Sequence, residues 1–389
     1  MKKEAVNILE LKRRNQAAIL NLLTRQCMSR SDIARSLGLT RASAGEHIDR
    51  LMDEGMVCES GVGQIERGRK PMLFDIVPDY GYFAGIYLSR EDCYFGLVDM
   101  KGCIILGRSL KDAPIMEPER VLENAATGIL SMIEECSLIA DKLIGVGFSV
   151  PGPVDAKNGV IISPPGFSHW HNVSPSKTLG KFISQPILIE NNAASQTMAE
   201  MRFGLGRKYK SFLSLLVDSG IGGGIIINGR RVTGEGGFGA ELGHTSIIMD
   251  GRLCACGNRG CLERYAAIPE ILRDCFSPRD GFNTWQQVVN GAEKNDARCI
   301  DAIEREAHYL ATAIVNYVNI LEPQAIVLGG DLQYKPKRIS LLLKEAISAR
   351  AIMRKVHNIT VLPSALEPNH HILSAAATTI DRYYEEGLY

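Results

Sequence analysis

The first 77 residues show the spacing of apolar and polar positions that is typical of short helices followed by a β-hairpin. From Asn7 to about Val77 the pattern is helical at first, and a hairpin-like segment with Gly61 and Gly63 follows. This region differs from the rest of the chain, so we predict a domain boundary near residue 78. The apolar side of the first predicted helix consists of Ile19, Leu20, Leu22 and Leu23.

Two further helices are predicted within this region. A short helix from Ser31 to Leu37 is opened by a serine cap, and Gly38 supplies the turn after it. Thr40 can cap a third helix from Arg41 to about Glu54. Helix, turn and capped helix together predict a helix-turn-helix with the third helix as recognition helix. The residues expected to face inward are Ile48, Leu51 and Met52, and those expected to face outward are Arg41, Ser43, Glu46 and His47.

The rest of the chain alternates between apolar strand-like runs and helical segments, which predicts an α/β fold. A long helix is predicted from Ala297 to about Leu321, before the last strand. At 389 residues the chain is too long for one ordinary core, so two or three domains are expected. The predicted strands are Tyr82 to Leu88, Tyr94 to Asp99, Leu143 to Val150, Ile187 to Ile189, Phe212 to Val217 and Ala325 to Leu328.

Charge changes this picture only locally. The net charge is +0 at pH 7, so the whole chain offers no electrostatic reason to bind nucleic acid. Between Leu11 and Arg50, however, there are eight Lys or Arg residues and only three Asp or Glu residues. This local excess of positive charge favours phosphate contacts. The ten cysteines without a secretory leader indicate a reducing cytosol, and no apolar run is long enough to span a membrane. We therefore expect a cytoplasmic protein without membrane insertion.

A recognition helix enters the major groove with its N-terminal side chains at the base edges. The returning edge of the predicted hairpin carries a basic tip that could follow a phosphate backbone or insert an arginine into a minor groove. The alternatives are a three-helix dimerisation or regulatory module and, for the tip, a solvated charged turn. The candidate DNA contacts are Arg30, Thr40, Arg41, Ser43, Glu46, His47, Arg67, Arg69 and Lys70.

The most specific chemistry lies between Glu241 and Glu263. Four soft or borderline metal ligands fall in this stretch, and glycines at 257 and 260 let the backbone turn tightly enough for three sulfurs to converge. One imidazole and three thiolates satisfy the tetrahedral preference of zinc and leave no open position, so the site is predicted to be structural, with one zinc per chain. The alternative is a disulfide or unrelated thiols. The predicted ligands are His244, Cys254, Cys256 and Cys261.

This segment, ExGH followed by CxCGxxGCxE, resembles the signature of the ROK family of sugar kinases and sugar-responsive repressors. The resemblance implies a two-lobed, actin-like or ribonuclease-H-like sugar kinase fold. Plain kinases of the family lack an N-terminal extension, whereas the winged helix-turn-helix resembles the repressor branch. The expected domains are a DNA-binding domain at 1–78, a first α/β lobe at 79–190 completed by about 370–389, and a second lobe at 191–369 with the zinc loop and a dimerisation surface.

The resemblance also implies sugar-contacting residues, namely Asn191, Asn192, Glu241, His244 and Glu263. His244 would serve both metal and sugar through its two ring nitrogens. Two structural alternatives stay open: Glu263 could orient a zinc ligand, and Asn191 could cap the helix that begins near Ala193. Trp170 could stack on a pyranose face or simply pack in its loop.

Two parts of the kinase machinery are not matched. Where kinases of the family carry a D-x-G-G-T phosphate turn, this sequence has Tyr87 to Glu91, whose larger side chains and added carboxylate would crowd and repel a nucleotide phosphate. The general-base Asp of the kinases is replaced by Asn192, whose carboxamide cannot accept a hydroxyl proton near neutral pH. We therefore expect a protein that binds sugar without phosphorylating it.

The function that follows is a sugar-responsive transcriptional regulator, most simply a repressor of carbohydrate uptake or catabolism genes, that binds operator DNA and a sugar or sugar phosphate. A homodimer or a dimer of dimers would convert a change between lobes into a changed distance between recognition helices. One alternative is an ATP-dependent sugar kinase of the ROK family with residual activity. Another is a repressor whose signal comes from a protein partner such as a sugar transporter.

Overall fold

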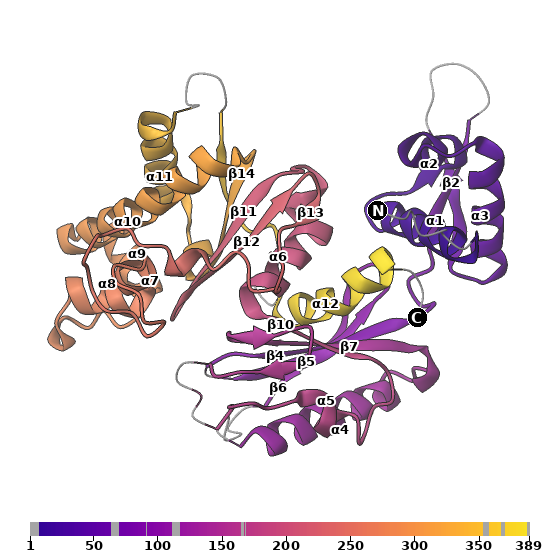
Figure 1. Cartoon of the computed structure of the whole chain (residues 1–389), viewed down its shortest axis with the longest axis horizontal. Helices are drawn as coiled ribbons and strands as arrows, with labels where there is room; N and C mark the ends of the chain where they lie inside the picture. Colours follow the sequence, from indigo (N-terminus) through magenta and orange to yellow (C-terminus); the bar gives the residue numbers. More distant parts are fainter. Residues whose placement is uncertain are drawn as a thin grey trace. The chain divides into compact units, whose positions relative to one another are not determined.

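A computed structural model of the chain divides into two compact units. The first unit consists of Met1–Phe203 together with Pro368–Tyr389, and the second consists of Gly204–Glu367 (Figure 1). Three residues named above, Arg67 and Arg69 of the basic tip and Glu91 of the phosphate-turn position, lie outside the described residues. The structure describes residues 8–63, 70–90, 92–110, 117–164, 167, 169–352, 358–366 and 370–386.

The first unit begins with three helices and a small sheet, as the hydrophobic pattern predicts. The helices are α1 (Ile8–Leu23), α2 (Arg30–Leu37) and α3 (Arg41–Asp53). The strands β1 (Met28–Ser29), β2 (Val57–Val62) and β3 (Met72–Ile76) form an antiparallel sheet in the order β1-β3-β2. Strands β2 and β3 are the two sides of the predicted wing hairpin (Figure 1).

Local capping explains where α2 and α3 begin. The hydroxyl of Ser29, not Ser31, accepts a hydrogen bond from the backbone N–H of Asp32 and caps α2. Gly38 ends α2 in the left-handed region with φ of 66°, and the Thr40 hydroxyl accepts from the Ser43 N–H at 3.1 Å to cap α3. The core of these helices comprises the fully buried Ile19, Leu20, Leu23, Ile33, Ile48 and Leu51.

The predicted orientation of His47 is wrong. His47 is only 9 % exposed, and its Nε2 lies 3.4 Å from Nδ2 of Asn15 in α1. Burial lowers the pKa of His47, Lys12 and Arg50 act in the same direction, and Glu46 opposes them. The buried face of α3 includes His47 together with Ala44, Ile48 and Leu51, so it is not made of apolar residues alone. His47 is therefore not available as a DNA contact.

The remainder of the first unit is a five-stranded mixed sheet in the order β10-β7-β4-β5-β6. Helices α4 and α12 lie on opposite faces of this sheet (Figure 1), and α12 also packs against α6 and α1. The elements are β4 (Tyr82–Leu88), β5 (Cys93–Asp99), β6 (Ile104–Ser109), β7 (Leu143–Val150), β8 (Val154–Asp155), β9 (Val160–Ile161), β10 (Ile187–Asn191), α4 (Pro118–Glu135), α5 (Pro175–Leu179), α6 (Asn192–Phe203) and α12 (His371–Glu386).

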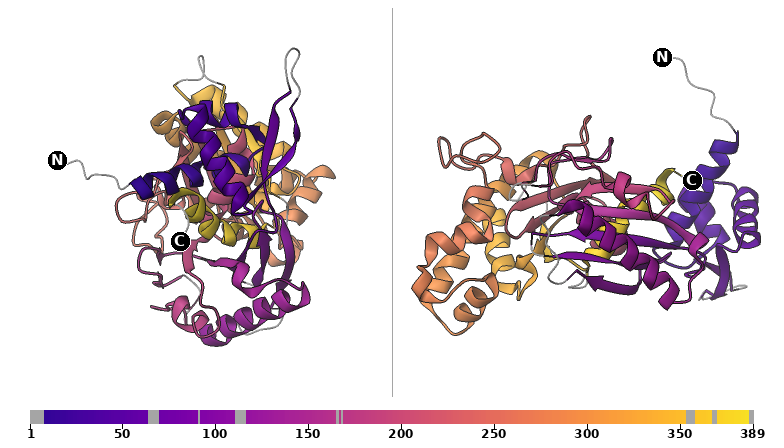
Figure 2. Two further views of the ribbon diagram at one scale, coloured as in Figure 1. Left: turned by 90° about the vertical axis from the view of Figure 1, so that its right-hand side faces the viewer. Right: turned by 90° about the horizontal axis from the view of Figure 1, so that it is seen from below.

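Glycines in this sheet allow α12 to lie directly on the backbone of β4 and β7 (Figure 2). A Cβ atom at Gly85 would lie 2.1 Å from the carbonyl oxygen of Ile372, and one at Gly147 would lie 1.9 Å from that of Ala375. Both distances are far below any real contact, and the obstructing atoms are backbone. Glycine is therefore required at these two positions by the close approach of the helix.

The second unit contains another five-stranded sheet, in the order β13-β12-β11-β14-β15. Strand β12 is antiparallel to β11. Strand β14 is parallel to β11, and β15 is parallel to β14. The elements are β11 (Phe212–Val217), β12 (Ile221–Ile227), β13 (Arg230–Arg231), β14 (Ala325–Gly330), β15 (Thr360–Pro363), α7 (Glu263–Ala266), α8 (Ile268–Cys275), α9 (Trp285–Glu293), α10 (Ala297–Leu321) and α11 (Lys337–Arg350).

The predicted strands and the long helix are all present, but the boundary predicted between the two lobes differs from the observed one. Helix α6 packs against α12 in the first unit, so the division falls after Phe203 and not after residue 190. Asn191 and Asn192 therefore belong to the first unit, while Glu241, His244 and Glu263 belong to the second. Within the described ranges, none of the helices combines the length and the apolar character required to cross a bilayer.

Candidate metal centre and ligand site

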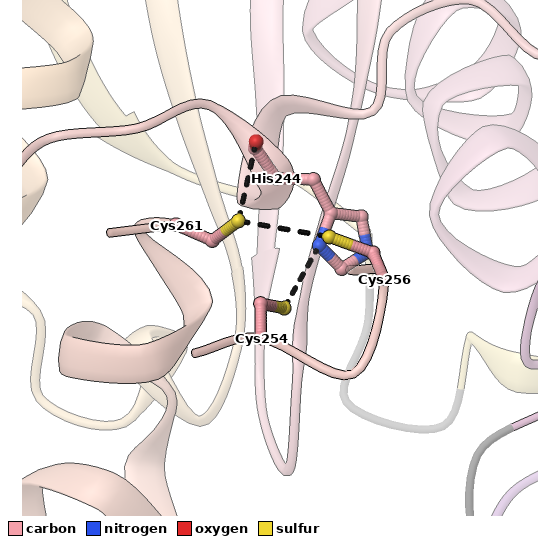
Figure 3. Close-up of side chains that lie close together, drawn as sticks. All are labelled: His244, Cys254, Cys256 and Cys261. Atoms are coloured by element: carbon pink, nitrogen blue, oxygen red, sulfur yellow. Dashed lines mark hydrogen bonds between the residues drawn. The ribbon is translucent and has the colours of Figure 1, made fainter. Parts of the chain in front are cut away.

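The side chains of His244, Cys254, Cys256 and Cys261 point toward one another (Figure 3). One ligand atom from each residue lies within 4.8 Å of the other three. The Sγ atoms of Cys256 and Cys261 are 3.7 Å apart, and Sγ of Cys254 is 3.6 Å from Nδ1 of His244. A tetrahedral zinc with bonds of about 2.3 Å holds its sulfur ligands at about this separation.

These distances argue against the disulfide alternative. A disulfide requires about 2.05 Å between sulfurs, and each of the ten cysteines is a free thiol in this structure. Three sulfurs and one imidazole nitrogen at a common centre match the donor set that zinc prefers. The residues present therefore fit a zinc ion.

Tight turns bring the three cysteines together. Gly257 and Gly260 both have positive φ, 90° and 74°, and a Cβ at Gly260 would lie 1.8 Å from the carbonyl oxygen of Ile248. The N–H of Cys254 donates to the carbonyl of Asn258 at 2.8 Å. The hydroxyl of Tyr317 in α10 donates to the carbonyl of Leu242 at 2.6 Å and so anchors the short turn that carries His244.

The surroundings shift the pKa values of the three thiols in different directions. Burial raises the pKa of Cys261 to about 12 and also raises that of Cys254, whereas hydrogen bonds led by the Asn258 N–H outweigh burial and lower that of Cys256. Metal binding at this cluster must therefore release protons.

The two carboxylates that flank the cluster have different environments. Oε2 of Glu263 accepts a hydrogen bond from the Ile221 N–H at 2.9 Å, at the start of β12 after the glycine-rich turn. Glu263 thus supports that turn and not one of the four ligand side chains. Glu241 is exposed, but the atoms packed around its carboxyl raise its pKa; the charge of Glu263 acts in the same direction and that of His244 opposes it.

Asn191 is the N-terminal cap of α6, which was one of its two open roles. Its Oδ1 accepts from the N–H of Ala193 at 2.8 Å and more weakly from that of Ala194 at 3.4 Å. The amide group of Asn191 remains half-buried at the end of β10.

Asn192 is buried and joins three elements. Its Nδ2 donates to the carbonyl of Leu88 in β4 at 3.0 Å, and its Oδ1 accepts from the Ser149 hydroxyl of β7 at 2.7 Å. The Ser149 hydroxyl is also 2.6 Å from that of Ser195 in α6. These partners stand 43 and 104 positions from Asn192 in the chain, so no local sequence signal could have revealed the network.

Hydrogen bonds between Ser89 and Asp92 join the ends of β4 and β5 at the position of the phosphate turn. Ser89 donates to the Asp92 carbonyl from its N–H at 2.8 Å and from its hydroxyl at 2.9 Å. Tyr87 packs on His371 of α12, with ring centroids 4.6 Å apart. Trp170 is fully buried against Phe148, so of its two open roles the structure supports packing.

Most candidate DNA contacts in the described part of the chain lie at the surface. Thr40, Arg41, Glu46 and Lys70 are exposed, and Ser43 is half-buried at the start of α3. Arg30 is held by a bidentate ion pair with Asp49 of α3, and its guanidinium lies 5.1 Å from the ring centroid of Phe74 in β3. The start of α3 is therefore accessible, while Arg30 braces α2 against α3 and β3.

Comparison with known proteins gives relatives over almost the full length. The chain is 27% identical to the xylose repressor of Bacillus subtilis (strain 168) over 376 residues, which cover 96% of this chain and 97% of the repressor. It is 29% identical to the glucokinase of Thermotoga maritima over 309 residues, covering 73% of this chain and 96% of the kinase.

The fold is shared with a solved protein described as a ROK family transcriptional regulator, homolog of the Escherichia coli MLC protein. The TM-score is 0.81 at 21% identity, and 97% of this chain and 98% of that chain are covered. A ROK hexokinase from Thermus thermophilus has a TM-score of 0.65 over 76% of this chain, so the two α/β units have the actin-like kinase fold. The model of the ROK family matches residues 83–381, and the chain belongs to this family.

Proposed function

We propose that this protein is a sugar-responsive transcriptional regulator, most simply a repressor, that binds operator DNA through its N-terminal domain and a sugar through its ROK domain. The observation that carries the proposal is the end-to-end similarity to a xylose repressor, which includes the helix-turn-helix region. The glucokinase relative spans only 73% of this chain. A capped and accessible α3 beside a β2–β3 wing is what a DNA-binding module requires.

The ligand-facing residues support a carbohydrate as effector. Glu241 and Glu263 supply carboxylate oxygens, and His244 supplies an imidazole, next to a cluster that fits one structural zinc. With Nδ1 directed at the cysteines, Nε2 of His244 is left to donate a hydrogen bond to a sugar hydroxyl. Zinc would serve here to fix the loop that carries these side chains.

A response to sugar requires two states with different operator affinity. Sugar binding would favour one of these two states over the other. In a homodimer, such a shift would change the distance between two recognition helices that must match half-sites about one DNA turn apart. Operator release is then the expected outcome.

We also propose that the protein is not a sugar kinase. Asn192 cannot act as a general base, and its carboxamide is already committed to Leu88 and Ser149. Ser89 and Arg90 occupy the turn where a nucleotide phosphate would need close backbone approach.

Replacing Asn192 by aspartate, which supplies the missing carboxylate, should not create kinase activity. The carboxylate would lie against the Leu88 carbonyl in a buried site. Both groups are hydrogen-bond acceptors, so the hydrogen bond that Asn192 donates there would be lost. We expect a loss of about 1–3 kcal/mol in the free energy of unfolding and no phosphorylation of any sugar with ATP. A coupled phosphorylation assay and thermal melts measure both. A variant that phosphorylates a sugar would favour the kinase alternative.

The function is tested by operator binding of the full chain at fixed salt, with titration of a panel of sugars and sugar phosphates that includes xylose and glucose. We expect one sugar to release the operator. Arg41→Ala should weaken operator binding by about 5- to 150-fold, as expected for a lost contact of about 1–3 kcal/mol. Arg120→Ala, at an exposed arginine of α4, is the matched control and should bind as the wild type does.

The alternatives give different results in the same experiment. Operator binding that no sugar alters would favour a signal from a protein partner such as a sugar-transport protein. Failure to bind any promoter DNA would contradict the regulator function itself.

A further inference from the structure

The C-terminal end of α6 holds together three helices of the first unit. Arg202 is only 2 % exposed. Its Nη1 donates to Oδ1 of Asn21 in α1 at 2.9 Å, and its Nη2 forms an ion pair with Asp381 of α12. The same guanidinium lies 5.1 Å from the ring centroid of Tyr384 in α12. One buried cation therefore joins α6 both to the first helix of the DNA-binding domain and to α12.

The next residue of α6 makes a second connection to that domain. Phe203 packs on the turn between β5 and β6, where a Cβ at Gly102 would lie 2.4 Å from the phenyl ring. In the same turn, Nζ of Lys101 forms an ion pair with Asp75 of β3 at 2.7 Å. The end of α6 is thus linked to both α1 and the wing strand β3.

The other end of α6 begins at Asn191 and Asn192, two of the predicted sugar contacts. Asn191 caps the helix, and Asn192, its first residue, is hydrogen-bonded to Leu88 and Ser149. Helix α6 has 12 residues and therefore spans about 18 Å. It is one continuous helix, with predicted sugar contacts at its start and the contacts to α1 at its end.

From α1 the connection continues to the recognition helix. Asn15 of α1 contacts the buried His47 of α3, and the apolar face of α1 packs against α3 and α2. A displacement of α1 by α6 would therefore move α3, whose N-terminal residues are the proposed base contacts.

Helices α6 and α12 both carry buried polar side chains among their apolar ones. Both amide atoms of Gln196 and the hydroxyl oxygens of Thr378 and Thr379 are buried without a protein hydrogen-bond partner in the described part of the chain. Buried polar groups that are only partly satisfied stabilise an interface less than apolar packing does.

We propose that Arg202 is a positioning residue through which α6 transmits sugar binding to the DNA-binding domain, with Asn21 as the receiving group on α1. The proposal rests on the sugar-responsive function above. It goes beyond that function because it identifies a coupling contact away from both the ligand-facing and the DNA-facing residues.

The test is Asn21→Ala in the full-length protein. Alanine suits a helix and leaves the Arg202–Asp381 pair intact, so the fold should survive. We expect sugar affinity by calorimetry and operator affinity without sugar to stay within about 3-fold of wild type. The ratio of operator affinities without and with sugar should fall from about 10-fold or more to below about 3-fold. Asn21→Asp, which keeps an acceptor for Arg202, should retain the wild-type ratio.

Asn124→Ala, at a half-buried asparagine of α4, is the matched control and should respond as wild type does. An Asn21→Ala protein that responds to sugar as strongly as wild type would overturn the proposal while leaving the regulator function in place. A wild-type protein whose operator binding is indifferent to every sugar would instead overturn the sugar response, and the proposed transmission with it.

Discussion

Replacing Cys261 by alanine is expected to empty the metal centre and abolish the response to sugar. Cys261 is fully buried, and its Sγ is one of four ligand atoms that converge within 4.8 Å. Structural zinc contributes about 10–16 kcal/mol of binding energy in small zinc domains, and much of this energy depends on a complete tetrahedral ligand set. We expect zinc affinity to fall by more than about 100-fold, since even the loss of an outer-shell partner costs about 10- to 100-fold.

The loss should extend to the ligand site because the ligands and the carboxylates share one loop. His244 is both a predicted zinc ligand and a predicted sugar contact, and Glu263 follows Cys261 by two residues. Without the metal, these side chains lose their common support. The DNA-binding domain belongs to the first unit, so operator binding without sugar should persist.

Metal content per chain, by elemental analysis of the purified protein, is the deciding measurement. We expect about one zinc per chain in the wild type and less than about 0.1 in Cys261→Ala. Cys136→Ala, at a half-buried cysteine after α4 and outside the cluster, is the matched control and should keep its metal. Treatment of the wild type with a strong chelator should reproduce the loss of sugar response. A Cys261→Ala protein that retains a full equivalent of zinc would contradict the assigned ligand set.

Much of the fold could be predicted because several elements carry strong local signals. Strand β4 is a continuous apolar run, β7 and β11 are interrupted only by Ser149 and Ser214, and the observed bounds of all three are the predicted ones. Helix α10 has a sustained helical pattern over 25 residues and was also placed correctly. The convergence of three cysteines and one histidine followed from spacing and glycines within a single loop. In each case the decisive contacts are local in sequence.

The predictions that were wrong or incomplete depend on contacts between distant segments. His47 looked like a polar surface residue, but α1 covers it. Helix α6 was assigned to the second lobe, yet it packs against α12 and its Arg202 donates to Asn21 of α1, so its partners come from the two ends of the chain. The partners of Asn192 lie in β4 and β7. A single sequence does not reveal such pairings, because a buried polar residue and an exposed one look alike until their neighbours are known.

The Gly147→Ala substitution is expected to destabilise the first unit more than an alanine at Gly85 or Gly45 would. The added Cβ would lie 1.9 Å from the carbonyl oxygen of Ala375 and 2.7 Å from its carbonyl carbon, so a backbone segment of α12 must move away from the sheet. Overpacking against side chains costs about 1–3 kcal/mol, and a backbone obstacle cannot rotate aside. We expect a loss of at least about 3 kcal/mol in the free energy of unfolding, or about 6–12 °C in the melting temperature of the unit.

Thermal unfolding of Gly147→Ala and Gly45→Ala side by side separates this close approach from the general effect of adding a methyl group. Gly45 lies inside α3, and a Cβ there would meet only Nη1 of Arg30 at an ordinary 3.5 Å. Since alanine is the better helix former, Gly45→Ala should stabilise the protein by about 0.5–1 kcal/mol. A Gly147→Ala protein as stable as wild type would mean that α12 does not rest on the backbone of β7.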